Sequence, residues 1–142
     1  ELEASIAKYR LNTRVKLTGA LDQRQVCRLY RHSDIFALAC VVARNGDRDG
    51  MPTVLIEAMA SGIPVITTPV TGIPELVKDG ETGFLVPQHD ATALADTLQK
   101  MINDAELRTC MGEKARQRAV EGFDIQRNAS DLVDLFQELV KR

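Results

Sequence analysis

Residues 34–68 read DIFALACVVARNGDRDGMPTVLIEAMASGIPVITT, and this stretch decides the fold. Its two ends, 34–40 and 64–68, are almost continuous apolar runs, which are typical of strands buried on both faces of a parallel sheet. Between them, 41–50 is a polar, glycine-containing loop, and 52–61 has the apolar spacing of a helix that ends at a glycine. The order strand, helix, strand predicts a parallel α/β unit with a right-handed crossover.

The flanking sequence extends this pattern in both directions. Residues 15–19 alternate and end at a glycine, as a short strand does, and 83–86 form a second short apolar run. Helices are expected at 3–11, 22–32, 73–77, 91–102, 104–119 and 126–141. We therefore predict one α/β domain over residues 1–142, with a Rossmann-like parallel sheet and flanking helices in 1–87 and a helical C-terminal tail in 88–142.

Composition restricts the class of protein. With 142 residues, 44% hydrophobic and 27% charged, the chain has the make-up of one soluble globular domain. A net charge of −2 gives no strong overall field for nucleic acid, and no apolar run approaches the roughly 20 residues of a membrane span. Cys27, Cys40 and Cys110 form no CxxC pair, so we expect three buried free thiols, no metal site and a cytoplasmic protein.

Glu57 is out of place in the helix at 52–61. The helix is apolar on most sides, which indicates burial, and an unpaired buried carboxylate costs several kcal/mol. Glu57 therefore needs a basic side chain, a set of N–H donors or the hydroxyls of a ligand. A carboxylate that caps a backbone turn is the structural alternative.

The start of the same helix is a candidate anion site. Pro52 suits the first turn, and Gly50 allows a ligand to approach the backbone. First-turn N–H groups are unpaired and carry the positive end of the helix dipole, so a diphosphate fits there, unless water or Asp49 caps them. With Asp49 before this start and Glu57 within the helix, a nucleotide-sugar matches the pattern, because carboxylates accept hydrogen bonds from sugar and ribose hydroxyls.

These residues, with SGIPVI at 61–66 and GIPELV at 72–77, resemble the GT-B-fold retaining glycosyltransferases of family 4, in which an acid and a small loop precede E-A-M-A, G-x-P-V and G-x-P-E. The resemblance implies the C-terminal, donor-binding half of a GT-B fold. It implies that Glu57 holds the ribose hydroxyls and that Asp49 lies near the transferred sugar, these two being the catalytic acids. The donor-binding set that it implies is Gly50, Met51, Pro52, Thr53, Val54 and Glu57.

The resemblance also implies the reaction and its partners. It implies a hexosyltransferase-type enzyme that takes sugar from a UDP-, GDP- or ADP-sugar with retention, without cofactor or metal, and passes it to a carbohydrate or lipid-linked acceptor held by an N-terminal domain of the same protein. The family's usual Arg and Lys segment does not precede Val15, so we expect N-terminal truncation and an inactive fragment. A peripheral position at the inner face of the membrane is the alternative to a freely cytoplasmic one.

One departure and three rival interpretations stay open. The first acid is Asp49 where the family has a glutamate, so its role could pass to Asp47 or Arg48, and Glu75 of the G-x-P-E turn could simply cap a helix. The rivals are a GT-B-like nucleotide-sugar epimerase or phosphorylase relative, a non-catalytic nucleotide-binding or interaction module, and a metal-dependent transferase that uses Asp47 and Asp49.

Overall fold

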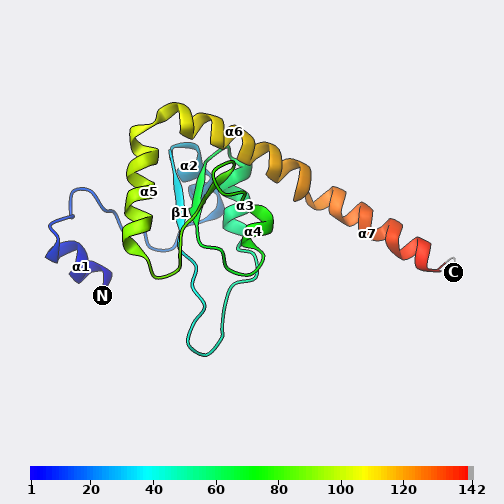
Figure 1. The fold of residues 1–142 in the computed structure, drawn as a ribbon, viewed down its shortest axis with the longest axis horizontal. Helices are drawn as coiled ribbons and strands as arrows, with labels where there is room; N and C mark the ends of the chain where they lie inside the picture. Colours follow the sequence, from blue (N-terminus) through cyan, green and yellow to red (C-terminus); the bar gives the residue numbers. More distant parts are fainter. Residues whose placement is uncertain (141–142) are drawn as a thin grey trace.

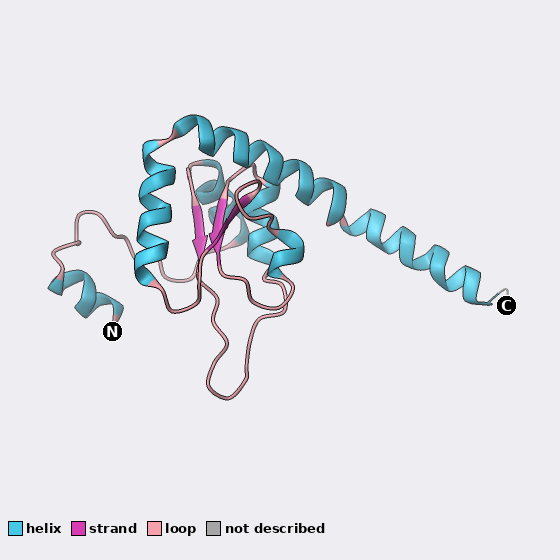
Figure 2. Ribbon diagram, in the orientation of Figure 1, coloured by secondary structure: helices cyan, strands magenta, loops and turns pink. Residues whose placement is uncertain are grey.

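The computed structural model describes residues 1–140 and contains a three-stranded parallel sheet (Figures 1 and 2). Strands β1 (Phe36–Leu38), β2 (Val65–Thr67) and β3 (Gly83–Leu85) lie in the order β1-β2-β3. Ala37 pairs with Ile66, and Ile66 pairs with Phe84. Because all three strands run in the same direction, their carboxyl ends meet at one edge. The predicted parallel α/β architecture is confirmed.

Helices cover both faces of the sheet. On one face, α2 (Gln23–Arg31), α3 (Thr53–Ala60) and α4 (Ile73–Leu76) pack around Val65. On the other, α5 (Ala91–Asn103) and the first half of α6 (Ala105–Gly122) pack around Ile66. The neighbouring residues Val65 and Ile66 are both fully buried and belong to opposite clusters. The sequence at 64–68 is continuously apolar because successive residues of β2 face the cores on opposite sides of the sheet.

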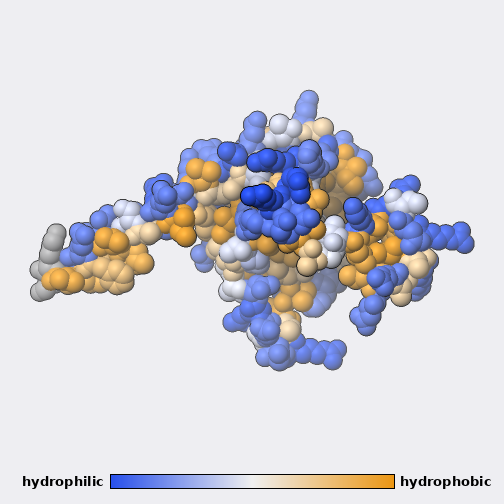
Figure 3. Space-filling model, turned by 180° about the vertical axis from the view of Figure 1, so that it is seen from behind, coloured by the Kyte–Doolittle hydropathy of each residue, from blue (hydrophilic) through white to orange (hydrophobic). Residues whose placement is uncertain are grey.

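Helices α1 (Leu2–Lys8) and α7 (Ile125–Val140) lie outside this packed body, and neither has a buried residue. Figure 1 shows α7 projecting away from the sheet and α1 lying apart on the opposite side. The space-filling view shows hydrophobic side chains exposed along α7 (Figure 3). The helical C-terminal tail is confirmed through residue 140, and residue 141 of the predicted last helix lies outside the described residues.

Aspartates cap the starts of three helices. Asp22 accepts from the Gln25 N–H at 2.8 Å, and the Gln25 side chain accepts from the Asp22 N–H at 2.8 Å, so the two form a capping box for α2. Asp90 and Asp104 accept from the third N–H of α5 and α6. These caps satisfy N–H groups that a helix otherwise leaves unpaired.

The prediction of a strand at 15–19 is wrong. The segment has no regular secondary structure, and Val15 and Leu17 are 41% and 48% exposed. An alternating sequence forms a strand only when a neighbouring strand pairs with it, and the sheet ends at β1 on one side and β3 on the other. The expectation of three buried thiols is also wrong, because Cys40 is buried while Cys27 and Cys110 are exposed.

Helix α6 locks α3 and α4 in place. Arg116 donates to the Ala60 carbonyl at the end of α3 at 2.7 Å, and Arg118 donates to the Leu76 carbonyl at the end of α4 at 2.6 Å. Gly112 brings the α6 backbone against the turn that follows α3, where a Cβ atom would lie 2.2 Å from the Gly62 carbonyl oxygen. No helix among the described residues has the length and apolarity to span a membrane.

Candidate functional site

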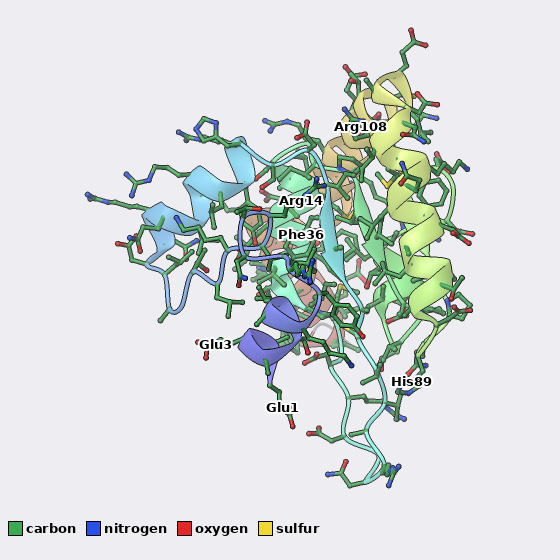
Figure 4. The ribbon with its side chains drawn as sticks, turned by 90° about the vertical axis from the view of Figure 1, so that its left-hand side faces the viewer. Glu1, Glu3, Arg14, Phe36, His89 and Arg108 are labelled. Atoms are coloured by element: carbon green, nitrogen blue, oxygen red, sulfur yellow. The ribbon has the colours of Figure 1, made fainter. Side chains whose placement is uncertain are left out.

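The loop at 41–50 begins and ends at the carboxyl edge of the sheet, where ligands of parallel α/β sheets bind. Three hydrogen bonds hold its base. The Val42 N–H donates to the Gln88 side chain at 2.8 Å, the Ala43 N–H to the Asp47 carbonyl at 2.8 Å, and the Gly72 N–H to the Gly50 carbonyl at 3.0 Å. Figure 4 shows the loop extending beyond the sheet, with His89 beside its base. The base is therefore fixed by neighbouring segments, and the tip extends into solvent.

Asp49 lies against the end of β1. One of its carboxylate oxygens is 4.0 Å from the Cys40 sulfur, which is the long distance of a weak thiol hydrogen bond. The Cys40 carbonyl in turn accepts from the buried Thr68 hydroxyl, so the end of β2 holds this cysteine as well. Burial first, and the negative charge of Asp49 second, raise the pKa of the Cys40 thiol. Sequence analysis missed this contact because it assigned Cys40 only a place in the core.

The first turn of α3 is open. Its N-cap is Pro52, which makes no side-chain cap, and the Leu55 N–H bonds only to the Pro52 carbonyl at 3.1 Å. The N–H groups of Thr53 and Val54 have no hydrogen-bond partner within residues 1–140. Both residues are exposed, so the positive end of α3 faces solvent. Asp49 does not cap this turn, which removes that structural alternative.

The remaining donor-site candidates lie directly before this turn in the chain. Met51 and Pro52 are half-buried, and Gly50 is exposed. A Cβ atom on Gly72 would lie 3.2 Å from the Met51 side chain and 3.3 Å from the Gly50 carbonyl oxygen. The glycine of the G-x-P-E turn therefore lets the segment after β2 approach the backbone that leads into α3. Glu75 of that turn is exposed on α4.

Glu57 has a protein partner that the sequence analysis did not foresee. It is half-buried, and its carboxylate accepts a hydrogen bond from the Tyr30 hydroxyl on α2 at 3.2 Å. The same hydroxyl lies 3.4 Å from the Val54 carbonyl oxygen. Burial, followed by the charge and the hydrogen bond of Glu57, raises the pKa of Tyr30 to about 12. The partner of Glu57 is therefore a phenol hydroxyl and not a basic side chain or a set of N–H donors. Its signal in the sequence was the position of Tyr30 on the apolar face of 22–32.

The two acids thus have different neighbours. Asp49 contacts the end of β1, and Glu57 contacts α2 one turn into α3. A carboxylate has two oxygens and accepts several hydrogen bonds, so each acid retains capacity for ligand hydroxyls. Among residues 1–140 no group of three His, Cys, Asp or Glu side chains has the arrangement of a metal site.

The contact between Cys40 and Asp49 gives a pH-dependent prediction. Replacing Asp49 with asparagine removes a negative charge beside the thiol, so the Cys40 pKa should fall and the reactive thiolate should form at lower pH. The measurement is the rate of Cys40 alkylation by iodoacetamide against pH, in a Cys27→Ser, Cys110→Ser background because those thiols are exposed. Asp47→Asn is the matched control. A midpoint that Asp49→Asn leaves in place would contradict the contact.

The family profile described as glycosyl transferases group 1 matches residues 1–118. Among curated proteins, the chain is 41% identical over 101 residues to the amylovoran biosynthesis glycosyltransferase AmsK of Erwinia amylovora, covering 71% of this chain and 25% of AmsK. It is 32% identical over 136 residues to the N-acetyl-alpha-D-glucosaminyl L-malate synthase of Bacillus anthracis, covering 96% of this chain and 34% of that protein. The chain therefore spans only a quarter to a third of these relatives.

Solved structures share the fold. Sucrose-phosphate synthase from Thermosynechococcus elongatus superposes with a TM-score of 0.84 at 29% identity, over 99% of this chain and 34% of that one. Anabaena Alr3699/HepE, in a crystal structure with UDP-glucose, superposes with a TM-score of 0.83 at 25% identity, over 96% of this chain and 36% of that one. These superpositions place the three strands and their flanking helices in a glycosyltransferase fold of the GT-B type.

Proposed function

Because the chain belongs to the group 1 glycosyl transferases, we propose that it is the donor-binding part of a retaining, family 4 glycosyltransferase of hexosyltransferase type. It would bind a nucleotide-diphosphate sugar at the carboxyl edge of the sheet. The acceptor, a carbohydrate or a lipid-linked sugar, would be held by an N-terminal domain of the same protein. We place this reaction in the cytoplasm.

The observation that carries this proposal is the open first turn of α3. Among residues 1–140 the N–H groups of Thr53 and Val54 have no hydrogen-bond partner, and both residues are exposed at the positive end of the helix dipole. A diphosphate fits such a turn without any cationic side chain. When the bond between the anomeric carbon and the diphosphate breaks, negative charge grows on the leaving oxygen, and fixed N–H dipoles at that point stabilise it.

The acids would bind the two ends of the donor. Asp49 precedes the open turn and would accept hydrogen bonds from hydroxyls of the transferred sugar, near its reacting carbon. Glu57 would accept from the ribose hydroxyls, with the Tyr30 hydroxyl fixing its carboxylate in place. Gly50, Met51 and Pro52 would supply backbone and apolar contacts between these groups. In this arrangement Tyr30 is a positioning residue, because it acts through Glu57.

Titration calorimetry tests the proposal. UDP is the first nucleotide to use, because HepE was crystallised with UDP-glucose, followed by GDP and ADP. Glu57→Gln should weaken binding of the preferred nucleotide by about tenfold or more, since a hydrogen bond to a charged group contributes roughly 1.5–3 kcal/mol. Glu75→Gln, the loss of an exposed acid on α4, is the matched control and should leave affinity unchanged.

Two results would contradict the assignment. If Glu57→Gln lowers the melting temperature but leaves nucleotide affinity unchanged, Glu57 is structural. If no nucleotide binds to a protein that contains this chain, a non-catalytic interaction module becomes the better interpretation. An epimerase would bind nucleotide but would convert the sugar of the donor without transferring it, which product analysis by NMR distinguishes.

A further inference from the structure

A glutamine side chain ties the connection between β3 and α5 to the loop at 41–50. The Val42 N–H donates to the Gln88 side-chain oxygen at 2.8 Å, although the two residues are 46 positions apart in the sequence. Val42 comes two residues after Cys40, whose sulfur contacts the Asp49 carboxylate. The hydrogen bond to Gln88 therefore joins the loop next to the contact that holds Asp49.

The backbone on both sides of Gln88 is fixed by regular structure. Before it, the Val86 N–H donates to the Thr67 carbonyl at 2.8 Å, which continues the pairing of β3 with β2. After it, the Asp90 side chain accepts from the Ala93 N–H at 2.9 Å and caps α5. A side chain mounted between a strand and a helix is held more precisely than one on a free loop. Gln88 is therefore a rigid support for the loop.

Side-chain packing does not replace this hydrogen bond on the α5 side of the loop. Val41 is 41% exposed and lines a surface hollow together with His89 and Leu94. Val42 is half-buried and packs against the opposite core, on the α3 side of the sheet. If the acceptor oxygen of Gln88 were lost, the Val42 N–H would be left unpaired in a partly buried place, and this arm of the loop would move to let water reach it.

We propose that Gln88 is a positioning residue for sugar transfer, which holds Val42 so that the Asp49 carboxylate keeps its place at the end of β1. This inference rests on the proposed function, in which Asp49 lies near the reacting carbon of the donor. Gln88 acts through the backbone of the loop and is not among the residues proposed to contact the donor. Its effect on the rate follows from geometry, because a misplacement of about 1 Å at a reacting centre costs up to roughly 100-fold.

Turnover tests this role in a protein that contains this chain and transfers sugar. Gln88→Leu removes the acceptor oxygen and should lower kcat by about tenfold, with the KM for the donor unchanged because Glu57 and the first turn of α3 are intact. Gln88→Glu keeps an oxygen in reach of Val42 and should restore most of the rate. Gln99→Leu is the matched control and should leave kcat unchanged, since the Gln99 side chain donates to Asn103 on the same helix.

A double-substitution cycle determines whether Gln88 acts through Asp49. If it does, Gln88→Leu should lower kcat by less than about twofold when Asp49→Asn is already present, because residues that act as one unit are not additive. A full tenfold loss in both backgrounds would mean that Gln88 acts independently. An unchanged kcat in Gln88→Leu alone would mean that its contact with Val42 is only structural. Either result overturns the proposal.

The Cys40 thiol reports the place of Asp49 without any sugar donor. Burial first, and Asp49 second, raise the Cys40 pKa, so a loosened loop should lower it. Gln88→Leu should therefore shift the pH midpoint of Cys40 alkylation downward, in the same direction as Asp49→Asn. The measurement uses the chain with Cys27 and Cys110 replaced by serine, because both of these thiols are exposed.

This measurement separates the positioning role from the proposed function. A midpoint that Gln88→Leu leaves in place, or that Gln99→Leu lowers equally, overturns the proposal whatever the chain transfers. If the midpoint falls but neither Gln88→Leu nor Asp49→Asn lowers kcat, Asp49 has no part in transfer and the role of Gln88 in the reaction fails with it. Nucleotide binding is tested separately, by the calorimetry of Glu57→Gln.

Discussion

Replacing Gly112 with alanine is expected to destabilise the fold by about 3 kcal/mol, the upper part of the range for overpacked sites. The new Cβ atom would lie 2.2 Å from the Gly62 carbonyl oxygen and 3.3 Å from the Pro64 ring. The first of these is a backbone atom, so no side-chain rotation relieves the clash. Gly62 itself has a φ of +79°, in the left-handed region that glycine tolerates best. Helix α6 must therefore move away from α3, which opens the core. Urea denaturation measures the loss.

A second glycine of the same helix supplies the control. Gly122 ends α6, and a Cβ atom there would meet nothing within 4 Å. Because alanine favours helix over glycine by up to about 1 kcal/mol, Gly122→Ala should leave stability unchanged or raise it slightly. Equal losses at the two positions would show that the contact between Gly112 and Gly62 has no special importance.

Asp49→Asn is expected to lower the rate of sugar transfer by about 100-fold or more, the scale seen when one charge-stabilising group is removed from an active site. Nucleotide affinity should change little, because the α3 turn and Glu57 remain intact. The measurement is nucleotide release from the sugar donor, in a protein that contains this chain and transfers sugar. The loss should appear in kcat rather than in KM for the donor.

Asp47→Asn separates the role of Asp49 from that of the loop's overall charge. Asp47 lies on the same loop, and its carbonyl accepts from Ala43, but the carboxylate near Cys40 belongs to Asp49. We expect Asp47→Asn to reduce turnover much less. An unchanged rate with Asp49→Asn, together with a large loss with Asp47→Asn, would transfer the role to Asp47.

The sequence predicted those parts of the fold that depend on local pattern and burial. The runs at 34–40 and 64–68 are apolar on both sides, and β1 and β2 are neighbouring parallel strands. Asp22 and Asp90 cap helices because a cap needs only the next three residues. The alternating segment 15–19 led to a wrong strand prediction. Alternation shows which face of a strand would be buried, but it does not show whether a partner strand exists.

The site was predictable only in part for the same reason. The open start of α3 follows from Pro52 and the helix pattern, both local properties. The partners of the two acids come from residues far away in the sequence. Tyr30 reaches Glu57 across 27 residues, and Gln88 reaches Val42 across 46. Such contacts depend on how the helices pack around the sheet, and a single sequence does not show that packing.

Within residues 1–140, the hydrogen bonds that tie the loop at 41–50 to other segments lie at its base, and this has a consequence for changes in its length. Closing a longer loop costs only about 0.6 kcal/mol for each doubling of its length, so residues can be gained or lost around Asn45 with little penalty to the rest of the molecule. The anchors at Val42 and Gly50 would keep the entrance to α3 unchanged. Insertions at the tip would then change the length of the loop while the backbone that leads into α3 stays where it is.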